Sequence, residues 1–106
     1  MAWVYLTVAG LLEIVFAYGL KTAAGMTRLW PSVLTIIAAA ASLYLLSRAL
    51  RTIPIGTGYA VWTGIGAAGT ALVGMLWLGE ARSAARLACI ALILVGVVGL
   101  RVFAAD

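Results

Sequence analysis

Long apolar runs separated by short polar stretches divide the chain into segments at roughly residues 2–20, 30–47, 55–78 and 85–103. Each run has about 18 to 24 residues, and a helix needs about 20 apolar residues to cross a hydrocarbon core about 30 Å thick. None of the runs shows the regular alternation of polar and apolar positions that marks the strands of a membrane barrel. The pattern therefore predicts an all-α integral membrane protein in which a single domain, residues 1–106, contains four transmembrane helices.

The polar connections are short: they read KTAAGMTR at 21–28, RALRTIPIG at 48–56 and GEARSAAR at 79–86. Connections of this length bring consecutive helices back beside one another, so we expect them to be antiparallel neighbours. They also leave no room for a catalytic or binding domain outside the membrane. We interpret the first run as a retained span and not as a signal peptide, because no basic segment precedes it and it is as long as a full span.

The composition supports a membrane location. Hydrophobic residues make up 66% of the chain and charged residues 9%, whereas a soluble domain carries about 25% charged residues. A small domain could not bury so much apolar surface in water. The chain has one cysteine, Cys89, and no histidine, so we expect no intrachain disulfide, no metal site, no cofactor and no enzymatic activity. The net charge of +4 is spread over all the connections, which favours anchors that contact membrane lipid over a nucleic-acid partner.

The basic residues are almost evenly divided between the two sides of the membrane. The side with the N-terminus, the second connection and the C-terminus has three and the other side has four, namely Arg48, Arg51 and Arg101 against Lys21, Arg28, Arg82 and Arg86. An excess of positive residues normally marks the cytoplasmic side and sets the orientation. The balance predicts dual topology, in which two oppositely inserted copies form an antiparallel homodimer. The alternative is that one of these charges outweighs the others and fixes a single orientation.

Glu13 lies in the middle of an apolar run, VAGLLEIVFAYGL at residues 8–20, whereas Glu80 and Asp106 lie where water can solvate them. A charge near the bilayer centre costs about 3 kcal/mol or more, so such residues are by default functional. In an antiparallel pair, two copies of Glu13 would lie close together and titrate as a unit. A carboxylate there can hold a proton or a cation but not both well, which is the basis of proton-coupled antiport. The alternative is a neutral carboxyl group that only hydrogen-bonds a neighbouring helix.

Other polar and aromatic residues lie deep in the predicted spans and could share a pocket with Glu13. Phe16 follows Glu13 by one turn, Ser42 lies near the middle of the second span, and Tyr59 and Trp62 share a face of the third. Hydroxyl groups can fix a carboxylate by hydrogen bonds, and aromatic faces attract cations. The alternatives are plain packing for the aromatic residues and, for Ser42, a bond to its own helix backbone.

Glycines suggest where helices bend or meet. Gly64 and Gly66 lie in the third span, where they allow either a bend that moves during transport or close packing without motion. Gly96 and Gly99 lie among larger apolar residues of the fourth span. Small residues let membrane helices approach closely, so we expect this span to form the dimer contact, the alternative being packing within one subunit.

Three motifs together resemble the small multidrug resistance transporters, and the resemblance covers essentially the whole chain. The motifs are AGLLEIVFAYGLK with its central Glu13, GMTRLWPS after it, and IPIGTGYAVWTGIGA at the start of the third span. The resemblance implies an antiparallel dual-topology dimer in the bacterial inner membrane that exports cations in exchange for protons. By position, Glu13 matches the essential carboxylate, and Ser42, Tyr59 and Trp62 match residues around it. The GIG glycines match the helix bend, and the fourth span matches the dimer contact.

PIGTGYAVWTGIG, with Thr57 and Thr63, looks like the subtype that exports guanidinium, whereas drug exporters of the family more often have other residues at both positions. Phe16 departs from the tryptophan usual in that subtype, and Ala39 and its neighbours are small. Both changes could loosen the pocket. We therefore expect a proton-coupled exporter of guanidinium or small guanidinyl cations, with export of hydrophobic quaternary ammonium compounds as the alternative.

Two interpretations from other classes also remain open at this stage. A lone carboxyl group within the membrane suits a proton-carrying rotor subunit, although the balanced charges and deep aromatic residues argue against a ring. A small structural or regulatory membrane protein is the other. The dimer partner could be a second copy of this chain or a paralogue.

Overall fold

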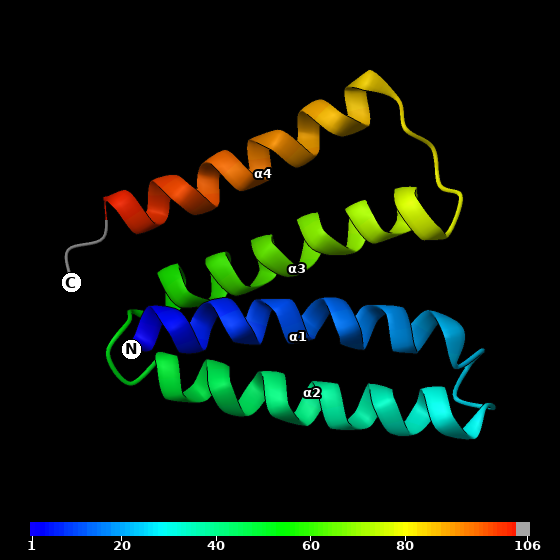
Figure 1. Cartoon of the computed structure of the whole chain (residues 1–106). Coiled ribbons are helices and arrows are strands. Elements are labelled where there is room, and N and C mark those ends of the chain that lie inside the picture. Colours follow the sequence, from blue (N-terminus) through cyan, green and yellow to red (C-terminus); the bar gives the residue numbers. More distant parts are fainter. Residues whose placement is uncertain (104–106) are drawn as a thin grey trace.

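The computed structural model describes residues 1–103, and within them the chain forms four helices (Figure 1). These are α1 (Ala2–Thr22), α2 (Leu29–Ala49), α3 (Ile55–Trp77) and α4 (Ala84–Val102). Each is long and apolar enough to cross a membrane. Each helix begins and ends within two residues of the corresponding predicted span. Asp106 lies outside the described residues.

Helix α1 lies between α2 and α3 and packs against both (Figure 1). Helices α2 and α3 follow one another in the chain but touch only slightly, because α1 separates them. The expectation that all consecutive helices are close neighbours is thus correct for the first and last pairs and wrong for the middle pair. Helix α4 packs mainly along α3 on the outside of the bundle, and Figure 1 shows the two diverging toward their connection.

The main core lies at the end of the bundle that holds the N-terminus. Its buried residues combine small and branched apolar side chains, namely Leu6, Ala9, Leu46, Ala49, Ile53 and Val61. A second, smaller cluster joins α3 to α4 through Ala68, Met75 and Ile90. Most of the remaining apolar surface is exposed, and only Ile90 is buried in α4. Such surface is stable against lipid or another apolar helix but not against water.

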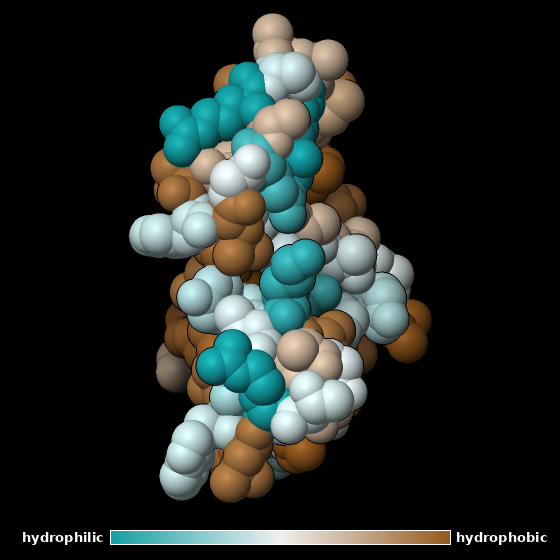
Figure 2. All heavy atoms as spheres, turned by 90° about the vertical axis from the view of Figure 1, so that its right-hand side faces the viewer, coloured by the Kyte–Doolittle hydropathy of each residue, from teal (hydrophilic) through white to brown (hydrophobic). Residues whose placement is uncertain are grey.

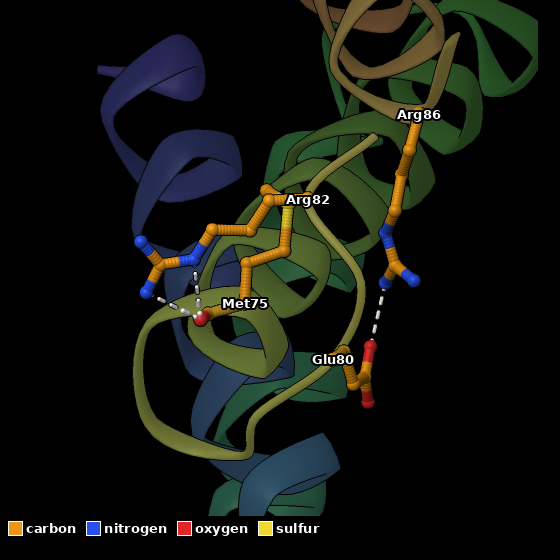
Figure 3. A network of polar contacts seen from close by, with 4 residues as sticks. All are labelled: Met75, Glu80, Arg82 and Arg86. Atoms are coloured by element: carbon orange, nitrogen blue, oxygen red, sulfur yellow. Dashed lines mark hydrogen bonds and ion pairs between the residues drawn. The ribbon is translucent and has the colours of Figure 1, made fainter. Parts of the chain in front are cut away.

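The connection between α3 and α4 is held by polar contacts (Figure 3). The guanidinium group of Arg82 donates two hydrogen bonds, of 3.1 and 2.9 Å, to the Met75 carbonyl oxygen at the end of α3. Ser83 caps α4 by accepting a hydrogen bond from the backbone N–H of Arg86 over 3.2 Å. Helix ends leave backbone groups without intrahelical partners, and these contacts satisfy some of them. The connection is therefore a defined structure at the membrane edge.

Candidate functional site

Glu13 points from the middle of α1 toward Gly66 of α3. A Cβ atom built at Gly66 would overlap the carboxylate of Glu13, with Oε1 at 2.9 Å and the other carboxylate atoms closer still. Glycine at position 66 therefore makes room for the carboxylate. Glu13 Oε2 is buried and has no hydrogen-bond partner among the described residues. A buried polar atom without a partner is costly, so this oxygen is suited to accept a proton or a cation.

Ser42 and Trp62 form a hydrogen-bonded chain beside this carboxylate. The Ser42 hydroxyl donates to the Ala9 carbonyl oxygen of α1 over 2.7 Å, and the Trp62 indole N–H donates to Ser42 Oγ over 2.9 Å. Ser42 is buried. Its hydroxyl therefore bonds another helix and not its own backbone, and a role of Ser42 in binding stays a prediction. One hydroxyl ties three helices together at the depth of Glu13.

A cavity of about 130 Å³ lies among these residues. Its lining combines the carboxylate, the hydroxyl and aromatic faces with small or apolar side chains, namely Glu13, Phe16, Ala39, Ser42, Leu43 and Trp62. A water molecule takes up about 30 Å³ in the liquid, so the space is sufficient for a small cation. The structure brings Glu13, Phe16, Ser42 and Trp62 to one cavity.

Tyr59 is placed differently from the other candidate residues. Its ring meets that of Trp62 edge-on, with centroids 5.1 Å apart and planes at 68°. The side chain is 53% exposed and is not among the lining residues of the cavity. Tyr59 therefore supports Trp62 and faces outward within this protomer.

A second cavity, of about 510 Å³, lies on the other side of Glu13 and extends to the connection between α3 and α4. Thr63, Gly66 and Thr70 line it from α3, and Glu80 and Arg86 line it at its outer end. The motifs in the sequence did not predict this cavity. A signal was present, because Thr63, Gly66 and Thr70 are spaced three and four residues apart and so share one helix face.

The glycines singled out from the sequence lie at helix contacts and at an open groove. Helix α3 runs as one element, and a Cβ at Gly64 would lie 2.6 Å from Val97 Cγ2 of α4. Gly64 and Gly66 therefore both allow close approach, and a bend that moves during transport stays a prediction. Gly96 and Gly99 line an apolar groove of about 710 Å³ between α3 and α4. Among the described residues, a Cβ at either position would meet nothing within 4 Å.

The fold and the site define a small helical membrane protein with a carboxylate, one oxygen of which is buried, beside a cavity lined by aromatic residues. The family model described as Small Multidrug Resistance protein matches residues 1–93. The chain therefore belongs to the small multidrug resistance family. Membership makes it a transporter and not an enzyme, and a multi-pass protein of the inner membrane.

Curated relatives share about half of its residues. The chain is 54% identical over 101 residues to a protein of Yersinia pestis, covering 95% of this chain and 97% of the relative. It is 55% identical over 101 residues to a protein of Citrobacter freundii, covering 95% and 96%. It is 53% identical over 104 residues to a protein of Salmonella typhimurium strain LT2, covering 98% and 99%. Each of these relatives is named "Guanidinium exporter".

Proposed function

We propose that this transporter exports guanidinium or small guanidinyl cations in exchange for protons. The observation that carries the proposal is that Glu13, whose buried Oε2 has no hydrogen-bond partner among the described residues, lines a cavity of small-cation size. Guanidinium is planar, and its N–H groups match the two oxygens of a carboxylate. The name shared by relatives that cover nearly the whole chain supports this substrate.

The exchange follows from the chemistry of a single carboxylate. A proton on Glu13 removes the negative charge that holds the cation, and a bound cation disfavours the proton. Each ion arriving from one side therefore displaces the other, provided that the cavity opens to the two sides of the membrane in turn. Alternating access of this kind couples proton entry to cation exit.

Ser42 and Trp62 form part of the cavity wall, and the Glu13 carboxylate makes the charged contact with the cation. The Trp62 N–H and the Ser42 hydroxyl hydrogen are already donated within the protein. A hydroxyl has two acceptor lone pairs, so Ser42 retains one that a guanidinium N–H could use. The aromatic rings of Phe16 and Trp62 line the same cavity and favour a cation by their faces.

The proposed functional unit is an antiparallel, dual-topology homodimer. Within the described residues one protomer leaves α4 packed on one side only, with an apolar groove lined by Gly96 and Gly99. A second copy on this groove would cover surface that membrane helices use for close packing. Paired Glu13 residues would then serve one transport pathway. A heterodimer with a paralogue is the alternative assembly.

Export of hydrophobic quaternary ammonium compounds is the second candidate function. Phe16 and Ala39 both line the cavity around Glu13. The two positions at which this chain differs from the usual guanidinium subtype are therefore positions that a bound substrate would contact. A quaternary ammonium has no N–H donors and depends on aromatic and apolar contact. The wall of this cavity is largely apolar and suits such a cation, provided that the cavity opens wide enough to admit it.

The test is substrate-driven proton current in proteoliposomes, with guanidinium compared with a tetraalkylammonium and with Glu13→Gln as the matched variant. Glutamine keeps the size of the side chain and removes its charge. We expect a guanidinium current that Glu13→Gln abolishes. Current with the tetraalkylammonium alone would replace the leading proposal by the second. Guanidinium current that survives Glu13→Gln would remove the carboxylate exchange mechanism.

A further inference from the structure

The structure contains a second carboxylate placed in the same way as Glu13. Glu80 lies against Gly74, where a built Cβ would be 2.5 Å from Glu80 Oε1, and the Glu80 backbone N–H donates to the Gly74 carbonyl oxygen over 3.0 Å. Glu13 lies against Gly66 of the same helix. Eight residues separate the two glycines, which corresponds to about 12 Å along a helix axis. Helix α3 therefore has two glycines that make room for a carboxylate: Gly66 deep in the helix and Gly74 near its end.

Both carboxylates line the cavity of about 510 Å³. Glu13 forms its inner end, and the side chain of Glu80, which is 44% exposed, lies at its outer end. Thr63 and Thr70 line the wall between them. Figure 2 looks onto this end of the molecule and shows hydrophilic residues gathered there between hydrophobic sides. A cation approaching Glu13 from this side would pass Glu80 first.

The two carboxylates differ in what they bind. Glu13 Oε2 has no partner among the described residues, whereas Glu80 Oε1 accepts a charged hydrogen bond from Arg86 Nη2 over 2.6 Å (Figure 3). The group on Glu80 is a guanidinium, the same chemical group as the proposed substrate. The Arg86 side chain is 34% exposed, and exposed ion pairs contribute little net free energy. A free guanidinium cation could therefore displace it.

We propose that Glu80 is an outer binding site for the substrate cation and that the guanidinium group of Arg86 competes for it. The inference rests on the proposed function, since it concerns the same substrate. A cation first replaces Arg86 on Glu80 and then passes along the cavity to Glu13. Lys21 also lines the cavity and adds a second positive charge, so Glu80 is needed to offset the repulsion that an entering cation meets.

The local structure allows Arg86 and Glu80 to be changed with little damage to the connection. Arg86 contributes to the cap of α4 through its backbone N–H, which a side-chain substitution leaves in place. Arg82, and not Arg86, holds the end of α3 through the Met75 carbonyl. Substitution of Glu80 by glutamine keeps its backbone bond to Gly74.

The experiment measures guanidinium-driven proton current in proteoliposomes as a function of guanidinium concentration. We expect Glu80→Gln to raise KM by roughly two- to fivefold, the size of a solvent-screened charge contact, and to leave the maximal rate nearly unchanged. We expect Arg86→Gln to lower KM by a similar factor, because Glu80 loses its internal competitor. In the Glu80→Gln background, Arg86→Gln should lower KM by a smaller factor than it does alone, because only the charge repulsion is then relieved and no competition for Glu80 remains.

Arg28→Gln is the matched control, because it removes one positive charge from the same side of the membrane without touching the cavity. A fall in KM with Arg28→Gln equal to that with Arg86→Gln would overturn the inference, since a general charge effect would then suffice. Unchanged KM in Glu80→Gln would overturn it and leave the proposed function standing. If the unsubstituted protein shows no guanidinium current that depends on Glu13, both the proposed function and this inference fail.

Discussion

Trp62 Nε1 and Ser42 Oγ are 2.9 Å apart, and this hydrogen bond links α3 to α2 although the two helices barely touch elsewhere. Ser42 in turn donates to the Ala9 carbonyl of α1, the helix that lies between them. The hydroxyl thus holds three helices in register at the depth of Glu13. Its removal should affect the fold as well as the site.

Ser42→Ala should lower the stability of the protein. The substitution leaves the Trp62 N–H without its acceptor, and a buried group that loses its hydrogen-bond partner costs about 1–3 kcal/mol. We expect the midpoint of thermal unfolding in detergent to fall by several degrees. Ser32→Ala is the control, because among the described residues the Ser32 hydroxyl bonds only the Arg28 carbonyl of the preceding turn. Equal midpoints for the two variants would contradict the linking role of Ser42.

Gly66→Ala should impair transport more than it impairs folding. The added Cβ would overlap the Glu13 carboxylate, and forcing an extra methyl group into a packed site costs about 1–3 kcal/mol. The side chain of Glu13 must then move, and a misplaced binding group slows turnover even where the fold tolerates the methyl group, so we expect the maximal rate of guanidinium-driven current to fall about tenfold.

Gly56→Ala is the control for that substitution. It adds the same methyl group to the same helix, at a position where the Cβ meets nothing within 4 Å among the described residues. Its current should match that of the unsubstituted protein. A Gly66→Ala variant with normal current would show that transport does not require the Glu13 carboxylate to lie against Gly66.

The helix positions were predictable because lipid imposes a simple condition on sequence. A single apolar run that spans the bilayer can form all its backbone hydrogen bonds internally only as a helix. The apolar runs therefore locate the helices to within two residues. The order of packing was not predictable in the same way. That α1 separates α2 from α3 depends on which faces carry small residues such as Ala9 and Ala49 at the core, and the spans are too uniformly apolar to mark those faces.

The sequence predicted which polar and aromatic residues line the cavity beside Glu13, apart from Tyr59, and did not predict how they are arranged. A carboxylate, a serine and a tryptophan within apolar runs stand out because each is costly there, and the structure brings Glu13, Ser42 and Trp62 together. The acceptor for Ser42 is a backbone carbonyl, and side-chain patterns carry no information about it. The outward position of Tyr59 also depends on helix rotation, which a pair spaced three residues apart leaves open.

Phe16 should control which cations the cavity accepts. Its ring lines the cavity of about 130 Å³ beside Glu13, so Phe16→Ala enlarges the space and Phe16→Trp reduces it. We expect Phe16→Ala to raise kcat/KM for a tetraalkylammonium relative to guanidinium by roughly tenfold or more, because a single methylene in an apolar pocket already changes such a ratio by about tenfold. Phe16→Trp should shift the ratio toward guanidinium. Competition currents with both cations measure the ratio.

Leu11→Trp serves as the size control for these variants, because Leu11 is on the same helix, is 51% exposed and does not line that cavity. The ratio of the two currents should stay as in the unsubstituted protein. A ratio that is insensitive to both Phe16 variants would place the selectivity elsewhere in the pathway.

Gly96→Leu tests the proposed contact between subunits. Within the described residues a Cβ at Gly96 meets nothing within 4 Å, so a larger side chain there should leave the protomer intact. If a second copy packs on this groove, the substitution should weaken the dimer by about 1–3 kcal/mol, as overpacking does. Light scattering during size-exclusion chromatography, at increasing ratios of detergent to protein, should show monomer appearing at lower detergent than in the unsubstituted protein. Gly56→Leu, at an equally open position of α3, should not move that threshold, and an unchanged threshold in Gly96→Leu would place the dimer contact on another face.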